Sequence, residues 1–250
     1  KGLLADNTEA SGDAPYTALE HQWDEGFGYF GAARDYGAYS DDEIAAKGGR
    51  DGWQGFHDTN GDGRIDLTSE YNFGHSTNAG KRDRGSAMSA PTDYTGAAFR
   101  AFLEGRALIV NAGGALDDAQ LEQLRGYRDA AVAAWERAIA ATAVHYVNDT
   151  LQDMADFGTP DYDFLAHAKH WSELKGFALA LQFDVRHSPL SSADLAEMHR
   201  LIGGDPVLPA AGATTIEQYR ADLGQVKDIF QRAYAFDPAN MGDAMGEGGW

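Results

Sequence analysis

The chain has 250 residues, of which 39 are acidic and 20 are basic, so its formal net charge is −19 at pH 7. Such a surface repels a phosphate backbone and attracts cations, which disfavours nucleic acid as a partner and favours metal ions. Adaptation to a saline habitat would produce the same acidity. The absence of cysteine excludes disulfides, thiolate ligands and a cysteine nucleophile. An apolar fraction of 43% indicates a globular protein, and no apolar run is long enough to predict a transmembrane helix.

Residues 1–15 are small and polar, and we expect them to be a flexible lead-in. The chain starts at Lys1 without a signal peptide, as both a processed exported protein and a shortened chain would. A helix is predicted from Thr17, which forms a capping-box pattern with Glu20, to about Tyr36. Three glycines in it, each costing roughly 1 kcal/mol in a helix, are expected to admit a neighbouring helix or a ligand. They are Gly26, Gly28 and Gly31.

Residues 37–92 are predicted to form an irregular insert that contains one short helix, Asp41–Lys47, followed by the glycine-rich stretch Gly48–Gly55. An irregular segment of this length inside a compact domain is usually functional or stabilised by an ion.

From Thr92 onward, apolar residues recur at helical spacing and predict five further helices. Asp117 and Gln120 form a capping pattern at the start of the longest one. We expect helices at 93–110, from 117 to about 157, from 161 or 163 to about 181, at 191–202 and at 215–234, and an irregular tail at 237–250. Strand-like alternation is nearly absent, so the predicted fold is an all-α helical bundle.

Two distant segments carry one signature: a tryptophan, then a glutamate two residues later, a glycine three further on and an aromatic residue directly after it. The first copy begins at Trp23 and the second at Trp171. Because each copy has a histidine within one helical turn of its glutamate, an imidazole and a carboxylate can share a helix face. The signature predicts a duplication, with pseudo-repeats at about 16–113 and 117–236.

These histidines and carboxylates predict one asymmetric polar seam between the two halves. Imidazole and carboxylate together suit iron, zinc or manganese inside helix bundles. A structural polar network, with a buried glutamate paired to Lys175 or to an arginine of residues 81–84, or a small-ligand site would use the same residues. The predicted seam consists of His21, Asp24, Glu25, His145 (beside Asn148), His170 and Glu173, whereas His57, His75, His187 and His199 are expected at the surface.

The strongest local motif lies at residues 58–70. Oxygen-bearing residues at alternate positions can converge on one calcium ion, which takes several oxygen ligands. Gly63 permits the sharp turn of an EF-hand-type loop, but Ser69 stands at the twelfth position and an acid follows one step later. Since no entering helix precedes it, we expect a calcium loop outside a helix–loop–helix frame; a solvated cluster of Asx turns has the same sequence. The predicted ligands are Asp58, Asn60, Asp62, Arg64 through its carbonyl, Asp66 and Glu70.

The segments HQWDEGFGYFG, AVHYVND, HWSELKGF and DTNGDGRIDLTSEYNFG resemble a bacterial domain family of unknown function that is similar to the imelysin-like proteins. The resemblance covers roughly residues 16–236. Imelysin-like proteins are exported, all-helical and built from two related bundles, and they carry a GxHxxE signature proposed to bind metal. The resemblance therefore implies two bundles and a periplasmic, outer-membrane-associated or extracellular location. His21 matches the signature histidine, but Leu19 and Asp24 stand where glycine and glutamate are expected.

The favoured function is a non-enzymatic, exported bacterial protein, stabilised by calcium and involved in iron or other metal handling at the cell envelope. One alternative is a metal-dependent, peptidase-like hydrolase with Glu25 or Glu173 as general base. Another is a structural or interaction module of the cell surface. No GxSxG elbow, phosphate-binding glycine loop or HExxH helix is present in the sequence, and no catalytic residue is assigned.

Overall fold

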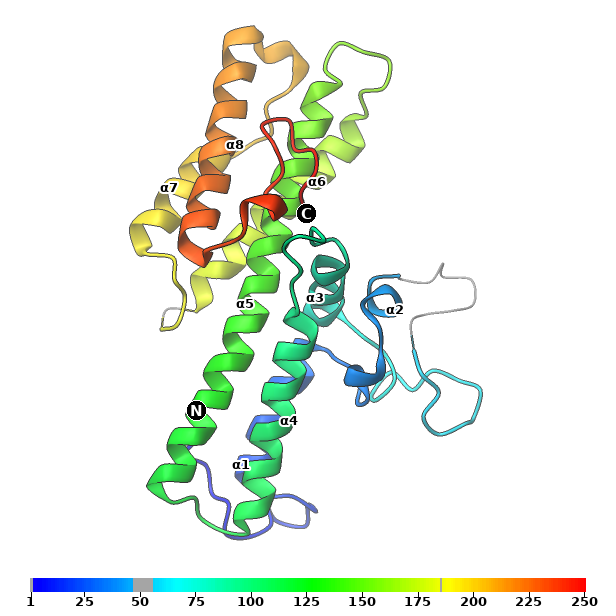
Figure 1. Ribbon diagram of the computed structural model, residues 1–250, viewed down its shortest axis with the longest axis vertical. Helices are drawn as coiled ribbons and strands as arrows, with labels where there is room; N and C mark the ends of the chain where they lie inside the picture. Colours follow the sequence, from blue (N-terminus) through cyan, green and yellow to red (C-terminus); the bar gives the residue numbers. More distant parts are fainter. Residues whose placement is uncertain (1, 47–55, 185) are drawn as a thin grey trace. The chain divides into compact units, whose positions relative to one another are not determined.

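The computed structural model describes residues 2–46, 56–184 and 186–250 (Figure 1). Within these ranges the protein is all-α, as predicted, with eight α-helices and no strand. None of the described helices combines the length and the apolarity needed to cross a bilayer. The helices are α1 (Ala18–Phe30), α2 (Asp41–Ala45), α3 (Gly74–Arg84), α4 (Tyr94–Ala112), α5 (Asp118–Ala155), α6 (Phe164–Ala180), α7 (Ser192–Ile202) and α8 (Ala213–Tyr234), with short 3-10 helices η1 (Tyr36–Ala38), η2 (Leu181–Phe183), η3 (Pro209–Ala211) and η4 (Pro238–Asn240).

The chain divides into two compact units, and α5 belongs to both. The first unit consists of Lys1–Arg84 and Asp93–Trp135, and the second of Gly85–Thr92 and Glu136–Trp250. This division falls inside a helix, whereas the predicted pseudo-repeats meet in the loop before it. The duplication itself stays a prediction.

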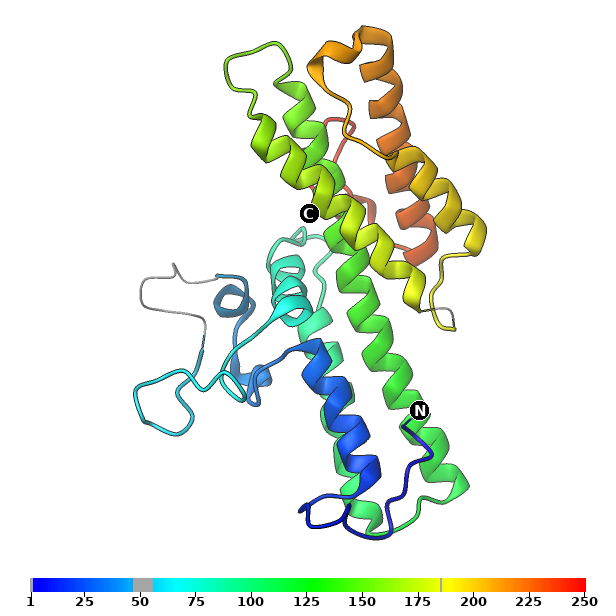
Figure 2. The same ribbon diagram turned by 180° about the vertical axis from the view of Figure 1, so that it is seen from behind.

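In the first unit, α1 lies along α4 (Figure 2). Trp23 is buried, and its indole N–H donates to the carbonyl oxygen of Phe102 over 2.8 Å. Gly105 makes room for this ring, since a Cβ atom there would lie 2.0 Å from the indole of Trp23. The tryptophan of the first signature copy is therefore a packing residue.

The first helix begins as predicted and ends early. Thr17 and Glu20 form both bonds of the capping box, but Gly31 adopts a left-handed φ of 82° and ends the helix after Phe30, before the predicted Tyr36. At the other two glycines, no neighbouring helix makes the predicted close approach. A Cβ atom at Gly28 would meet nothing within 4 Å, and one at Gly26 would make an ordinary contact of 3.6 Å with Phe102.

The lead-in makes defined contacts with the first unit. Asn7 is buried and donates its side-chain N–H groups to the carbonyl oxygens of Ile109 (3.0 Å) and Gly114 (2.8 Å). Ala10 and Thr17 form an isolated β-bridge.

Helix α3 was not predicted, because its buried face consists of small and polar residues rather than an apolar stripe. The buried face is formed by Ser76, Thr77, Ala79, Gly80, Arg82 and Asp83. The Asp83 carboxylate accepts the backbone N–H groups of Tyr94 and Thr95, both over 2.8 Å, and so caps the start of α4. The insert is therefore partly helical. Its first helix, α2, ends at Ala45, and the predicted continuation to Lys47 and the glycine-rich stretch lie outside the described residues.

In the second unit, Trp171 has a role similar to that of Trp23. Its indole N–H donates to the carbonyl oxygen of Ile202 (3.3 Å) and to the hydroxyl oxygen of Tyr219 (3.0 Å). Phe177, the aromatic residue of the second signature copy, stacks on Tyr146 of α5 with ring centroids 5.7 Å apart. Both signature tryptophans thus donate to the backbone of a neighbouring helix.

The irregular C-terminal tail is bound by two buried polar residues. Lys227 donates from its Nζ atom to Asn148 Oδ1 (3.1 Å) and to the carbonyl oxygens of Gly242 (3.1 Å) and Asp243 (2.6 Å). Asn148 in turn donates to the carbonyl oxygen of Trp250 over 3.0 Å. Asn148 therefore holds the tail and does not form the predicted pair with His145.

Candidate functional site

The backbone of the predicted calcium loop donates to its first aspartate. Asp58 Oδ1 accepts the N–H groups of Gly61 (2.7 Å) and Asp62 (3.2 Å), and Oδ2 accepts that of Gly63 (2.9 Å). Both glycines are left-handed, with φ of 72° and 73°, which side chains other than glycine rarely adopt. The sharp turn expected at Gly63 is present, and a second turn precedes it.

The other predicted ligands lie along the same loop. Asn60 Oδ1 accepts the N–H of Asp62 over 3.0 Å, and Asp62 Oδ1 accepts that of Arg64 over 2.8 Å. The side chains of Asn60, Asp62 and Arg64 are exposed, whereas Asp66 is half-buried. The hydroxyl and N–H of Thr68 lower the pKa of Asp66. The loop therefore carries several oxygen atoms that solvent ions can reach.

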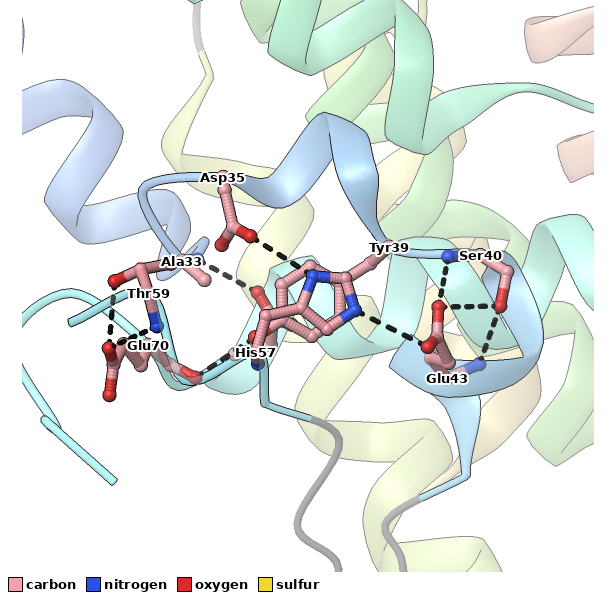
Figure 3. Close-up of polar contacts among 9 residues, drawn as sticks. Ala33, Asp35, Tyr39, Ser40, Glu43, His57, Thr59 and Glu70 are labelled. Carbon is pink, nitrogen blue, oxygen red and sulfur yellow. Dashed lines mark hydrogen bonds and ion pairs between the residues drawn. The ribbon is translucent and has the colours of Figure 1, made fainter. Parts of the chain in front are cut away.

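Glu70 joins the two ends of this loop. Its side chain is fully buried. Oε1 accepts both the N–H and the hydroxyl of Thr59 at 2.7 Å (Figure 3). Oε2 accepts the N–H of Asp66 at 2.9 Å. These donors, first the N–H of Asp66, lower the pKa of Glu70 and favour its charged form.

His57, predicted to be a surface residue, is instead half-buried in a network beside the loop (Figure 3). Its Nδ1 lies 3.0 Å from Asp35 Oδ2, its Nε2 lies 3.3 Å from Glu43 Oε1, and its ring stacks on Tyr39 with centroids 3.8 Å apart. Burial lowers the pKa of His57, but the hydrogen bonds and charges of the two carboxylates outweigh it, so the net shift is upward. Burial raises the pKa of Tyr39 to about 12, and its hydroxyl donates to the carbonyl oxygen of Glu70. The start of the loop is therefore fixed to η1 and α2.

The seam residues of the first unit are bound to neighbours of their own. His21 Nε2 lies 3.3 Å from Glu25 Oε1, and both side chains are about half exposed. Asp24 accepts from Arg106 Nε over 2.8 Å, and the same arginine donates to Glu20 over 2.7 Å. His21 and Asp24 therefore have different partners.

The seam histidines of the second unit meet two aspartates that were not predicted. His145 Nε2 lies 3.3 Å from Asp149 Oδ2, and His170 Nε2 lies 3.7 Å from the same oxygen. His170 Nδ1 lies 2.8 Å from Asp153 Oδ2. The predicted carboxylate, Glu173, is not among these four residues. The four-residue spacing of His145 and Asp149 was visible in the sequence, but their approach to His170 was not.

Other residues named from the sequence are structural. Lys175 donates to the carbonyl oxygen of Gly203 over 2.7 Å. Burial lowers the pKa of His75 and of His199, both predicted to be at the surface. His167 is fully buried, with its Nδ1 3.1 Å from the hydroxyl of Tyr162.

Glu136, which the sequence did not single out, is a buried carboxyl group of the second unit. Its Oε1 accepts the hydroxyl groups of Ser188 and Tyr234, both over 2.5 Å. Burial raises the pKa of Glu136, and the hydrogen bond and negative charge of Asp184 add to this shift. The environment therefore favours the neutral acid.

Across the described residues, no group of three or more histidine, aspartate or glutamate side chains is arranged, as it stands, to hold a metal ion. Comparisons with protein-family models, with curated proteins and with solved structures each found no match. The similarity to imelysin-like proteins therefore stays a prediction, and function is argued from the residues themselves.

Proposed function

We propose that this protein binds calcium through residues 58–70 and that the ion fixes the insert to the first unit. The observation that carries the proposal is the arrangement around Asp58, whose carboxylate accepts three N–H groups of its own loop. These bonds hold the loop in a tight turn without an ion, so little ordering is needed on binding.

The chemistry of the loop favours calcium over a transition metal. Calcium accepts amide and backbone carbonyl oxygens as well as carboxylates, so a site can form with few acidic side chains. Asp58, Asn60 and Asp62 would supply side-chain oxygens, and Arg64 its carbonyl oxygen. Asp66 adds a third carboxylate, and a divalent cation offsets the repulsion among them. Glu70 would brace the loop, since its carboxylate is fully buried and joins Thr59 to Asp66.

The resemblance to exported imelysin-like proteins supports a location at the cell envelope and a role in metal handling. It does not extend to catalysis. Glu25, one of the two predicted general bases, is half exposed, and its carboxylate is paired with His21. We therefore propose a binding protein and no hydrolase.

Calorimetric titration of chelator-treated protein with Ca²⁺, together with melting curves in Ca²⁺ and in EGTA, tests the proposal. We expect one saturable site. At a free Ca²⁺ concentration about a hundredfold above Kd, the ion should add about 2.7 kcal/mol to the free energy of unfolding. Mg²⁺ should bind more weakly, because it demands strict octahedral geometry.

Two aspartate variants provide the matched comparison. Asp58→Ala removes the carboxylate at the centre of the loop and should abolish both the heat and the stabilisation. Asp161→Ala removes an exposed loop aspartate of the second unit and should leave both unchanged. Identical melting curves of the wild-type protein in Ca²⁺ and in EGTA would overturn the proposal.

A further inference from the structure

The first unit contains a cavity between the lead-in and helices α1, α4 and α5. Its volume is about 190 Å³, and it is partly open to solvent. The described residues that line it all belong to the first unit. A cavity of about 150 Å³ with aliphatic and aromatic walls is large enough to bind benzene. This cavity therefore has room for a molecule with one aromatic ring.

Three aromatic side chains line the cavity, Trp23 of α1, Phe102 of α4 and Trp135 of α5. The rings of Trp23 and Phe102 meet edge to face, with centroids 6.2 Å apart. Trp23 is fixed by its hydrogen bond to the carbonyl oxygen of Phe102 and by the space at Gly105. Aromatic rings prefer edge-to-face or offset-stacked neighbours, and walls that are already ordered lose little entropy on binding. The walls therefore favour an aromatic ligand.

Gly26 forms part of the wall, and no close packing contact requires a glycine there. It lies inside α1, where alanine would be the better helix former. A Cβ atom at this position would meet only the ring of Phe102 within 4 Å, at an ordinary distance of 3.6 Å. Both residues line the cavity. Of the two occupants that the sequence suggested beside this glycine, a helix or a ligand, the geometry favours the ligand.

The charges around the cavity disfavour ligands of either sign. Arg128 lines the cavity and would repel a cation. Its Nη2 atom already lies 2.6 Å from Asp129 Oδ1, and the net charge of −19 repels anions. Among the described lining residues, only Arg128 and Gln22 have a charged or amide side chain, and both are partly exposed. A neutral hydroxyl group can accept a hydrogen bond from either of them.

We propose that this cavity binds one uncharged, single-ring aromatic molecule of the phenol class. The ring lies between the three aromatic side chains, and the hydroxyl group lies beside Gln22 and Arg128. No residue of the calcium loop, 58–70, is among the described lining residues, so the site does not depend on that loop.

The test is a calorimetric titration of the full chain with phenol in saturating Ca²⁺. Tryptophan emission gives a second readout, because Trp23 and Trp135 are part of the wall. We expect one saturable phenol site per chain. Benzoate and benzylammonium, which carry a negative and a positive charge, should each bind at least about tenfold more weakly, because a buried charge without a partner is costly.

Two glycines of α1 provide the matched variants. Gly26→Leu places a side chain beside Phe102 at the cavity and should weaken phenol binding at least about tenfold, as overpacking does. Gly28→Leu changes an exposed position with open space beside it and should leave phenol binding unchanged. Circular dichroism checks the fold. Gly26→Ala, which adds a single methyl group and should still weaken binding severalfold, serves if Gly26→Leu unfolds.

The outcomes separate this site from the calcium loop. Asp58→Ala should lose Ca²⁺ and keep phenol, so either proposal can fail alone. Absence of saturable phenol binding would overturn the site, and so would unchanged phenol affinity in the folded variants of Gly26. Benzoate or benzylammonium binding as tightly as phenol would overturn the assignment of an uncharged ligand.

Discussion

Trp23 and Gly105 fit each other so closely that neither can change alone. The indole occupies the space of the missing Cβ atom and donates to the backbone of α4 one turn earlier. At Gly28, by contrast, the space beside the backbone is open, so no close packing requires a glycine there. A glycine in a helix therefore marks close packing at one position and only lost stability at another.

The first prediction concerns this pair of glycines. Gly105→Ala should force Trp23 out of its position and lower the free energy of unfolding by about 1–3 kcal/mol, as overpacking does. Gly28→Ala should raise it by up to about 1 kcal/mol, because alanine is the better helix former. Urea denaturation measures both, and equal effects of the two variants would contradict the packing argument.

The second prediction concerns the buried acid Glu136. Because its pKa is raised in the folded chain, the folded chain holds this proton more tightly than the unfolded chain does. Its contribution to stability is complete below the ordinary glutamate pKa and is lost as the pH rises through the raised pKa. Glu136→Gln should remove this decline and leave the protein at least as stable at neutral pH.

Melting curves across the acid-to-neutral range measure the difference between Glu136→Gln and wild type. Glu104→Gln, at an exposed position on α4, is the control and should follow the wild-type profile. If the melting temperature of Glu136→Gln depended on pH in the same way as that of the wild type, the raised pKa assigned to Glu136 would be contradicted.

At the scale of elements, local chemistry predicted helix starts well and long-range contacts poorly. The capping pairs Thr17–Glu20 and Asp117–Gln120 form as the sequence indicated. Helix α3 was not predicted because its buried side chains are small or polar and bind partners in other segments of the chain. Such partners leave no periodic apolar pattern in the sequence. The approach of Asp153 to His170 escaped for the same reason, since their spacing in sequence carries no signal.

The third prediction concerns the two acids that cap α4. Asp83→Ala removes the acceptor of two buried N–H groups and should cost about 1–3 kcal/mol. Asp93→Ala removes an exposed cap whose carboxylate accepts the N–H of Gly96 over 3.0 Å and an N–H of the exposed Arg100 over 2.7 Å, and should cost about 0.5–1 kcal/mol. Chemical denaturation of the two variants checks the order, and a larger loss for Asp93→Ala would contradict it.

At the scale of the whole molecule, the net charge of −19 acts on every part of the chain. Self-repulsion of like charges destabilises a compact state, and salt screens it. The fourth prediction is therefore that NaCl raises the melting temperature in EGTA, as the Debye length falls from about 30 Å at 0.01 M to about 10 Å at 0.1 M. A falling melting temperature would mean that ion pairs such as Arg106–Glu20 dominate instead.

The sharing of α5 by both units has a consequence for how such a protein can evolve. Domains joined by a linker can be exchanged between genes as whole pieces. Here a genetic crossover within α5 would join two half-helices from different parent proteins. A crossover in the loop before α5 would separate the rest of the first unit from its own part of that helix, which extends to Trp135. Each unit therefore constrains the inheritance of the other, and new properties have to arise by substitution or by changes in loops such as residues 58–70.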